Sequence, residues 1–431
     1  MTPWVSKVFP YLLLSPLAIP LVIGSGLYYP YLFPKVILFY VLVLLALAAF
    51  ALLLTKGRAF HFARLNAWPT WIPAALLVLA YLASAFGTDF SKSFWSLFAR
   101  GDGLLLLTLS VASFYLILVS STQAVFRSLL QGVAVVATLV ALWAILEWMI
   151  VGGRVGGPIG NAAFLAGYLG VTFFVTLAAS EGLVRGWQRA LYASAILQLI
   201  AILLSATRGT MLALAVAGGV TLLYFAVAGT KRLRVVGAGG IIVLLLIAAG
   251  FWYFRADLAQ SSLAPVARIA QISLGDVNVT HRLFVWEHML TAVGEKPFLG
   301  YGAEHIASVF DSFYDPGAIT EEWFDRSHNA YLDYAIQYGV GGVALYLALI
   351  GTFFFGAFRY ARRNKRIGCL LILAGITYAT QNFFVFDTVS VWWLLLALIA
   401  VLLGETMDTG PVPTIEKLRN PAFGMLAGGV L

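Results

Sequence analysis

Long runs of apolar residues, separated by short polar segments, follow one another along the whole chain. Each run holds about 17–23 residues, enough for a helix to cross roughly 30 Å of hydrocarbon. The pattern predicts an all-α polytopic membrane protein with about twelve transmembrane helices. The expected spans are 9–29, 35–54, 71–87, 103–119, 128–150, 161–179, 191–206, 210–229, 235–254, 329–358, 367–385 and 389–404.

One polar stretch, 255–328, is too long for a simple turn, and such long connections are usually functional. We expect four parts: transmembrane helices 1–9 in residues 1–254, an extracytoplasmic catalytic loop with short interfacial helices in 255–328, helices 10–12 in 329–404, and a cytoplasmic tail in 405–431. The first apolar run contains Pro16 and Pro20 and no small-residue cleavage site, so it is expected to be a retained helix. The apolar end, 421–431, is where a further helix of a longer protein could begin.

Composition agrees with this class, since 61% of the 431 residues are hydrophobic and 11% are charged. The net charge of +8 reflects basic clusters at 231–234 and 359–366, which the positive-inside rule assigns to the cytoplasm. Both termini are then cytoplasmic and the long loop is extracytoplasmic. The charge therefore needs no nucleic-acid partner, and membrane lipid explains it. The single cysteine, Cys369, excludes a disulfide framework or a cysteine metal cluster.

His328 lies where the long loop runs into an apolar helix, in the segment 325–331. An imidazole titrates near neutral pH and, when neutral, suits a general base. Ser327 is expected to cap the helix, which places His328 in the first turn. Asp325, Asp333, Tyr331 and Tyr334 are candidates to orient the ring. The simpler alternative is a histidine that only hydrogen-bonds at a helix start.

Two arginines on the extracytoplasmic side are candidates for an anionic ligand. Arg208 follows a polar break at the outer membrane surface, and a guanidinium binds phosphate oxygens in pairs. Arg282 lies on an expected interfacial helix, capped by Asn278 or Thr280 and ended by Gly294, on one face with Trp286, Met289 or Leu290, and Val293. The alternatives are a snorkelling helix-end arginine and a solvated charge.

A glycine-rich turn, 154–161, leads into a helix with backbone amides free to face an anion. It lacks a nucleotide-binding pattern, and a flexible turn is the simpler interpretation. Glu147, near the outer end of its span, is either functional or paired locally, for example with Arg154.

These motifs resemble the O-antigen ligase family, the lipid-linked glycan ligases and polymerases that share a Wzy-type membrane region. The resemblance extends from about residue 95 to 390, in a consistent order along the chain. The matching segments are 100–103, 157–161 with Tyr168 and Leu169, 205–209, Arg282 with Trp286, 297–302, 327–332 with 339–342, and 381–387.

The resemblance implies a GT-C-like, metal-independent glycosyltransferase without a cofactor, and an aligned attack on the anomeric carbon would make it inverting. It would move a glycan from a polyprenyl (undecaprenyl) diphosphate carrier to an acceptor hydroxyl on a glycan, a glycolipid or a protein. His328 is implied to act on the acceptor as the catalytic residue, and Arg208 and Arg282 to hold the diphosphate. Additional candidate site residues are Arg100, Asn161, Arg326, Asn329 and Tyr331.

Other functions stay open at this point. A polysaccharide polymerase or a protein O-oligosaccharyltransferase of the same superfamily would differ only in the acceptor. A transporter or flippase suits twelve spans, but the chain shows no internal repeat of the kind common in carriers. A non-catalytic scaffold would leave Arg208, Arg282 and His328 without a common purpose.

Overall fold

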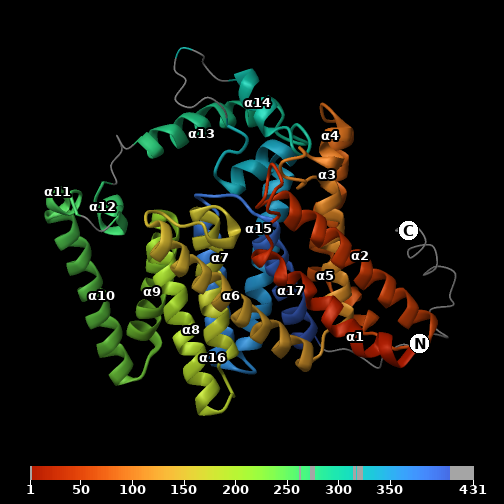
Figure 1. Ribbon diagram of the computed structural model, residues 1–431, viewed down its shortest axis with the longest axis horizontal. Coiled ribbons are helices and arrows are strands. Elements are labelled where there is room, and N and C mark those ends of the chain that lie inside the picture. The colour runs from red at the N-terminus through yellow and green to blue at the C-terminus, as the bar shows by residue number, and fades with distance from the viewer. Residues whose placement is uncertain (1, 262–263, 272–276, 314–316, 318–323, 408–431) are drawn as a thin grey trace.

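The computed structural model describes residues 2–261, 264–271, 277–313, 317 and 324–407. Within these ranges the regular structure is entirely helical, as the apolar pattern predicts (Figure 1). The predicted tail lies mostly outside the described residues. The α-helices are α1 (Thr2–Leu14), α2 (Phe33–Thr55), α3 (Ile72–Ala85), α4 (Phe90–Trp95), α5 (Leu104–Ser120), α6 (Gln123–Val151), α7 (Ala162–Ala179), α8 (Arg185–Leu204), α9 (Arg208–Ala228), α10 (Lys231–Tyr253), α11 (Arg255–Leu258), α12 (Ala264–Ala270), α13 (Val277–Glu295), α14 (Ile306–Phe313), α15 (Ala330–Ala361), α16 (Lys365–Gln381) and α17 (Val389–Thr406).

Ten helical segments of the described chain are long and apolar enough to cross a membrane, so the protein is a multi-pass membrane protein. The other two predicted spans correspond to α5 and α16, which have 17 residues each. Each of the twelve predicted spans therefore coincides with a helix. The largest difference between predicted and observed boundaries is at the first span, predicted as 9–29. There α1 begins at Thr2 and continues into the 3-10 helix η1 (Ser15–Leu21), which contains Pro16 and Pro20.

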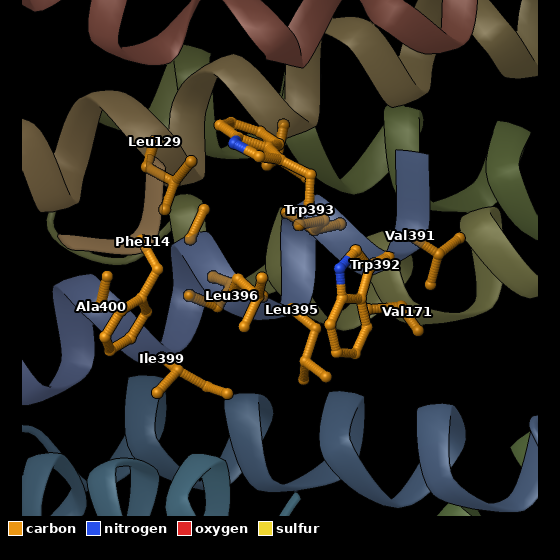
Figure 2. Close-up of a cluster of buried hydrophobic side chains, with 14 of the residues drawn as sticks. Phe114, Leu129, Val171, Val391, Trp392, Trp393, Leu395, Leu396, Ile399 and Ala400 are labelled. Atoms are coloured by element: carbon orange, nitrogen blue, oxygen red, sulfur yellow. The ribbon is translucent and has the colours of Figure 1, made fainter. Parts of the chain in front are cut away.

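Helix α17 forms the centre of the bundle. It is apolar all round and 89% of its span is buried, which is the pattern of a helix surrounded by others. Figure 2 shows Trp393, Leu396 and Ile399 of α17 among side chains from neighbouring helices. The indole of Trp393 also donates to the Ser113 hydroxyl at 2.9 Å. In contrast, α9 and α10 lie at one side of the bundle and are mostly exposed, as expected of helices that face lipid.

Helix α15 is kinked at Gly339, whose φ is +69°. The kink frees backbone groups that the segment 297–302 then binds. Val340 donates its amide to the Pro297 carbonyl at 2.7 Å, and Tyr301 donates its amide to the Ile336 carbonyl at 2.9 Å. A Cβ at position 339 would stand 2.3 Å from the Phe298 carbonyl oxygen, so only glycine fits. The conformation of α15 thus fixes the long loop to the bundle.

The helix α13 and the short helices α4, α11, α12 and α14 lie at one end of the bundle (Figure 1). Two contacts each join residues that the sequence assigns to one side of the membrane. Lys92 donates to the Ser308 hydroxyl at 2.9 Å at this end of the bundle, on the predicted extracytoplasmic side. Arg366 forms an ion pair with Glu181 at 3.1 Å, on the predicted cytoplasmic side. We call the end of the bundle that carries α4 and α11 to α14 the loop end. Which end faces the cytoplasm, and the four-part division of the chain, stay predictions.

Candidate functional site

His328 lies immediately before α15 with a left-handed backbone, at a φ of +54°. Such a φ is uncommon for residues other than glycine and is found where the surroundings impose it. The predicted cap is wrong: Asn329, and not Ser327, caps α15, and its side chain accepts from the amides of Tyr331 and Leu332. Consequently His328 precedes the helix and is not part of its first turn.

Ser327 holds the backbone on both sides of His328. Its hydroxyl donates to Asp333 Oδ1 at 2.5 Å and lies 2.9 Å from the Asn329 carbonyl, while its amide donates to the same Asp333 oxygen at 3.0 Å. The indole of Trp286 donates to the Ser327 carbonyl at 2.9 Å. Since Ser327 is fully buried, water cannot replace these bonds. This network stabilises the strained conformation of His328.

The ring of Phe386, in the turn between α16 and α17, lies next to His328 with 5.9 Å between ring centroids. The guanidinium carbons of Arg100 and Arg326 lie 4.7 Å and 5.6 Å from its centroid, within cation–π range. The predicted site residues Arg100 and Arg326 therefore lie against the same ring as His328.

The candidates for orienting His328 also have other partners, and which of them orients the ring stays a prediction. Asp325 forms an ion pair with Arg100, and Asp333 accepts from Ser327. The hydroxyl of Tyr331 donates to the Ala379 carbonyl at 2.8 Å. The ring of Tyr334 stacks on Tyr346, with 4.2 Å between centroids.

A buried ion cluster lies beneath this group. Arg326 bonds Asp102 at 2.8 Å and Glu304 at 2.5 Å, and the Ser96 hydroxyl lies within 3.0 Å of both carboxylates. Burial acts to raise the pKa of Asp102, but Arg326 and Arg100 outweigh it and lower that pKa. Burial raises the pKa of Glu304 to about 7 against the attraction of Arg326, and the Asp102 charge adds to the rise. Burial and the proximity of a second carboxylate are therefore the causes of the raised pKa of Glu304.

Four arginines gather at the loop end on the other side of the 382–388 turn. Arg154 donates from Nε to the Ser205 carbonyl at 2.9 Å, just before α9 begins at Arg208. Burial lowers the pKa of Arg154, and three nearby positive charges lower it further, those of Arg268, Arg208 and Arg282.

The start of α9 is fixed to the 382–388 turn. Thr210 donates to the side-chain oxygen of Gln381 at 2.9 Å, and a Cβ at Gly209 would lie 3.2 Å from Phe384. The guanidinium carbon of Arg282 lies 6.0 Å from the Phe384 ring centroid. Arg208 and Arg282, far apart in sequence, are thus brought together around this turn.

The predicted face of α13 packs towards the bundle. The ring centroids of Trp286 and Phe383 lie 5.6 Å apart. The sequence left open whether Met289 or Leu290 shares this face, and Met289 is buried while Leu290 is exposed. The predicted caps are wrong, because α13 begins at Val277, before Asn278 and Thr280. Its end at Glu295 is one residue beyond the predicted Gly294.

The glycine-rich turn binds an anion of the protein itself. Glu147 accepts from the amides of Gly156 at 3.4 Å and Gly157 at 2.7 Å. These two amides are therefore occupied, and Glu147 has a local backbone partner. Asn161 caps α7 by accepting from the Ala163 amide at 2.8 Å, and its predicted place in the site stays a prediction.

The predicted site residues do not include Arg154, Arg268, Glu304 or Asp387. Asp387 accepts from the hydroxyls of Tyr346 and Tyr378 and from Asn382, and so fixes the turn that carries Phe386. Its place in the motif 381–387 could have identified Asp387 as a site residue, whereas no sequence motif includes Glu304. Within the described residues, no three His, Cys, Asp or Glu side chains form a metal-binding group.

Comparison with known proteins identifies the region that carries these features. Residues 193–347 match the family model described as O-Antigen ligase, a range that includes Arg208, Arg282 and His328. A Rickettsia conorii protein provisionally named a polysaccharide ligase is 24% identical over 128 residues. That match covers 27% of this chain and 29% of the relative. The family model thus confirms the resemblance drawn from the sequence motifs over residues 193–347, which are similar to the O-antigen ligase family.

Proposed function

We propose that the protein is a membrane glycosyltransferase of the O-antigen ligase type. It moves a glycan from a polyprenyl diphosphate carrier, undecaprenyl diphosphate in bacteria, to an acceptor hydroxyl. The site faces the extracytoplasmic side of the cytoplasmic membrane. The family match and the polysaccharide ligase relative support a ligase-type function.

The gathering of Arg154, Arg208, Arg268 and Arg282 is the observation that carries the proposal. Four like charges repel one another, so their proximity is costly unless an anion binds among them. A diphosphate carries several negative charges and accepts the paired hydrogen bonds that guanidinium groups donate. Arg268 Nε is buried and has no hydrogen-bond partner among the described residues, which leaves a donor for such a ligand.

The reaction is a displacement at the anomeric carbon of the donor. The acceptor oxygen forms a bond to this carbon as its proton passes to His328. The bond from carbon to diphosphate breaks, and the diphosphate leaves with the electron pair. The arginines stabilise the negative charge that develops on it. Attack opposite the leaving group inverts the anomeric configuration.

The contacts of Phe384 and Phe386 support this division of roles. Phe384 lies beside Arg282, and Phe386, two residues later, lies beside His328. The leaving group and the proton acceptor therefore sit on either side of one short turn. A transporter would more often place its polar groups near the middle of the membrane.

Incubation of the purified protein with a polyprenyl-diphosphate glycan and a panel of acceptors tests the proposal. Mass spectrometry reads the products. Glycan joined to lipid A-core indicates a ligase, a ladder of repeats indicates a polymerase, and a modified protein indicates an oligosaccharyltransferase. The absence of product with every acceptor would contradict the proposal and favour a transporter or flippase.

A further inference from the structure

A cavity of about 90 Å³ lies beside Phe386, between the N-terminal ends of α5, α15 and α17. One water needs roughly 10–15 Å³ of such space, so the cavity has room for a larger molecule. Its lining includes the buried ion cluster and several aromatic side chains. The residues used below are Glu304, Arg326, Asp333, Tyr334, Tyr338 and Trp392.

Several polar atoms of the lining have no hydrogen-bond partner among the described residues. Both bonds that Asp333 accepts go to Oδ1, and Oδ2 accepts none from the described residues. Arg326 Nε is buried without a partner. The hydroxyls of Tyr334 and Tyr338 and the indole nitrogen of Trp392 donate to no described group. Arg326 Nε is the buried member of this set without a partner, and the other polar atoms line the open space of the cavity, where a ligand or ordered water can bond them.

One wall of the cavity is aromatic. Tyr334 stacks on Tyr346 with an interplanar angle of 13°, and its centroid lies 6.3 Å from that of Trp392. Flat apolar walls combined with a few placed polar groups are typical of small-molecule sites. The carboxylates of Asp333, Glu304 and Asp102 make the cavity unsuitable for a phosphate. A neutral molecule with many groups that both donate and accept fits it better.

We propose that this cavity binds a sugar ring of the acceptor glycan. Sugar hydroxyls donate to Asp333 Oδ2 and accept from Arg326 Nε and the two tyrosines, while the ring lies against the aromatic wall. Phe386 lines this cavity and also contacts His328, so a bound sugar is next to the proposed base. The arginines lie beyond Phe384, where the diphosphate leaves. The inference rests on the proposed function in assigning the sugar to the acceptor.

Saturation-transfer NMR of simple methyl glycosides tests the site without donor or turnover. The probes are the methyl glycosides of glucose, galactose, mannose, N-acetylglucosamine and a heptose, with the protein in a detergent that has no sugar headgroup. At least one glycoside should give a signal with the natural protein. The double variant Tyr334→Phe/Tyr338→Phe should weaken that signal at least fivefold, because only the two hydroxyls are removed.

Tyr115→Phe is the matched control, since the Tyr115 hydroxyl donates to the Thr70 carbonyl away from the cavity. Its signal should equal that of the natural protein. No signal from any glycoside, or an unchanged signal in the double variant, overturns the inference even if glycan transfer is observed. Glycoside binding that the double variant weakens, without transfer to any acceptor, supports the sugar site and counts against the proposed function alone.

Discussion

Replacing Ser327 with alanine tests how the structure holds His328. The Ser327 hydroxyl bonds the buried carboxylate of Asp333 at 2.5 Å and lies 2.9 Å from the Asn329 carbonyl. These bonds close the backbone around a histidine with a φ of +54°. Without the hydroxyl, His328 can relax to an ordinary conformation and leave its place beside Phe386.

The expected size of the effect follows from the bonds that are lost. A hydrogen bond to a charged group contributes about 1.5–3 kcal/mol. A left-handed backbone at a residue other than glycine costs about 1–3 kcal/mol, which favours relaxation once the restraint is gone. If the lost bond energy appears in the activation barrier, turnover should fall roughly 10- to 100-fold. Binding of the carrier should change little, because the arginines are untouched.

Steady-state glycan transfer measured at varied donor concentration separates the effect on turnover from the effect on binding of the polyprenyl diphosphate donor. Ser312→Ala is the control, since this serine is also at the loop end and its hydroxyl makes a single bond to the Ser308 carbonyl. Ser327→Thr keeps a hydroxyl and should recover part of the activity. Turnover within twofold of the natural protein in Ser327→Ala would refute a positioning role for Ser327.

Three further predictions concern the arginines, the ion cluster and the kink. Arg154→Ala should weaken binding of polyprenyl diphosphate about 10-fold in a titration, since a charged hydrogen bond contributes about 1.5–3 kcal/mol; Arg255→Ala, at an exposed arginine over Trp252, is the control, and equal affinities would count against the cluster. The folded-state pKa of Glu304 is raised to about 7, so the stability that its protonated form contributes is fully present below its ordinary pKa of 4.5 and is lost as pH rises to about 7. The Tm of the natural protein should therefore fall more between pH 5 and pH 7.5 than that of Glu304→Gln, and identical pH profiles would contradict the raised pKa of Glu304. Gly339→Ala should lower the free energy of unfolding by at least about 1 kcal/mol because of its φ of +69° and the Phe298 carbonyl. Gly351→Ala in the same helix, where a Cβ meets nothing within 4 Å, should be nearly neutral, and an equal loss in both variants would exclude the kink as the cause.

The helices were the most predictable part of the fold. Span length and hydropathy are properties of continuous segments, so all twelve predicted spans coincide with helices. Caps and kinks depend on single backbone angles and tertiary contacts. The sequence offered Ser327 as a cap, but Asp333 binds its hydroxyl and the cap passes to Asn329. The kink at Gly339 needs carbonyls from 297–298, about forty residues away, which no local pattern reveals.

The candidate site was predictable only where a motif carried chemistry. Arg208, Arg282 and His328 stood out because charged and titratable groups are rare in this chain, and their assigned roles stay predictions. Arg154 was noted as a partner for Glu147, but Glu147 binds backbone amides instead. The proximity of Arg154 to the other arginines arises from the packing of the 152–161 turn against the start of α9, which sequence spacing does not encode.

A single-turnover experiment with purified protein tests the central claim most directly. The donor is a labelled glycan on polyprenyl diphosphate, and both products are measured: the glycosylated acceptor and the released polyprenyl diphosphate. The natural protein should form them in equal amounts, and His328→Ala should form neither while it still binds the donor. Undiminished transfer by His328→Ala, or release of diphosphate without glycosylated acceptor in the natural protein, would contradict the account.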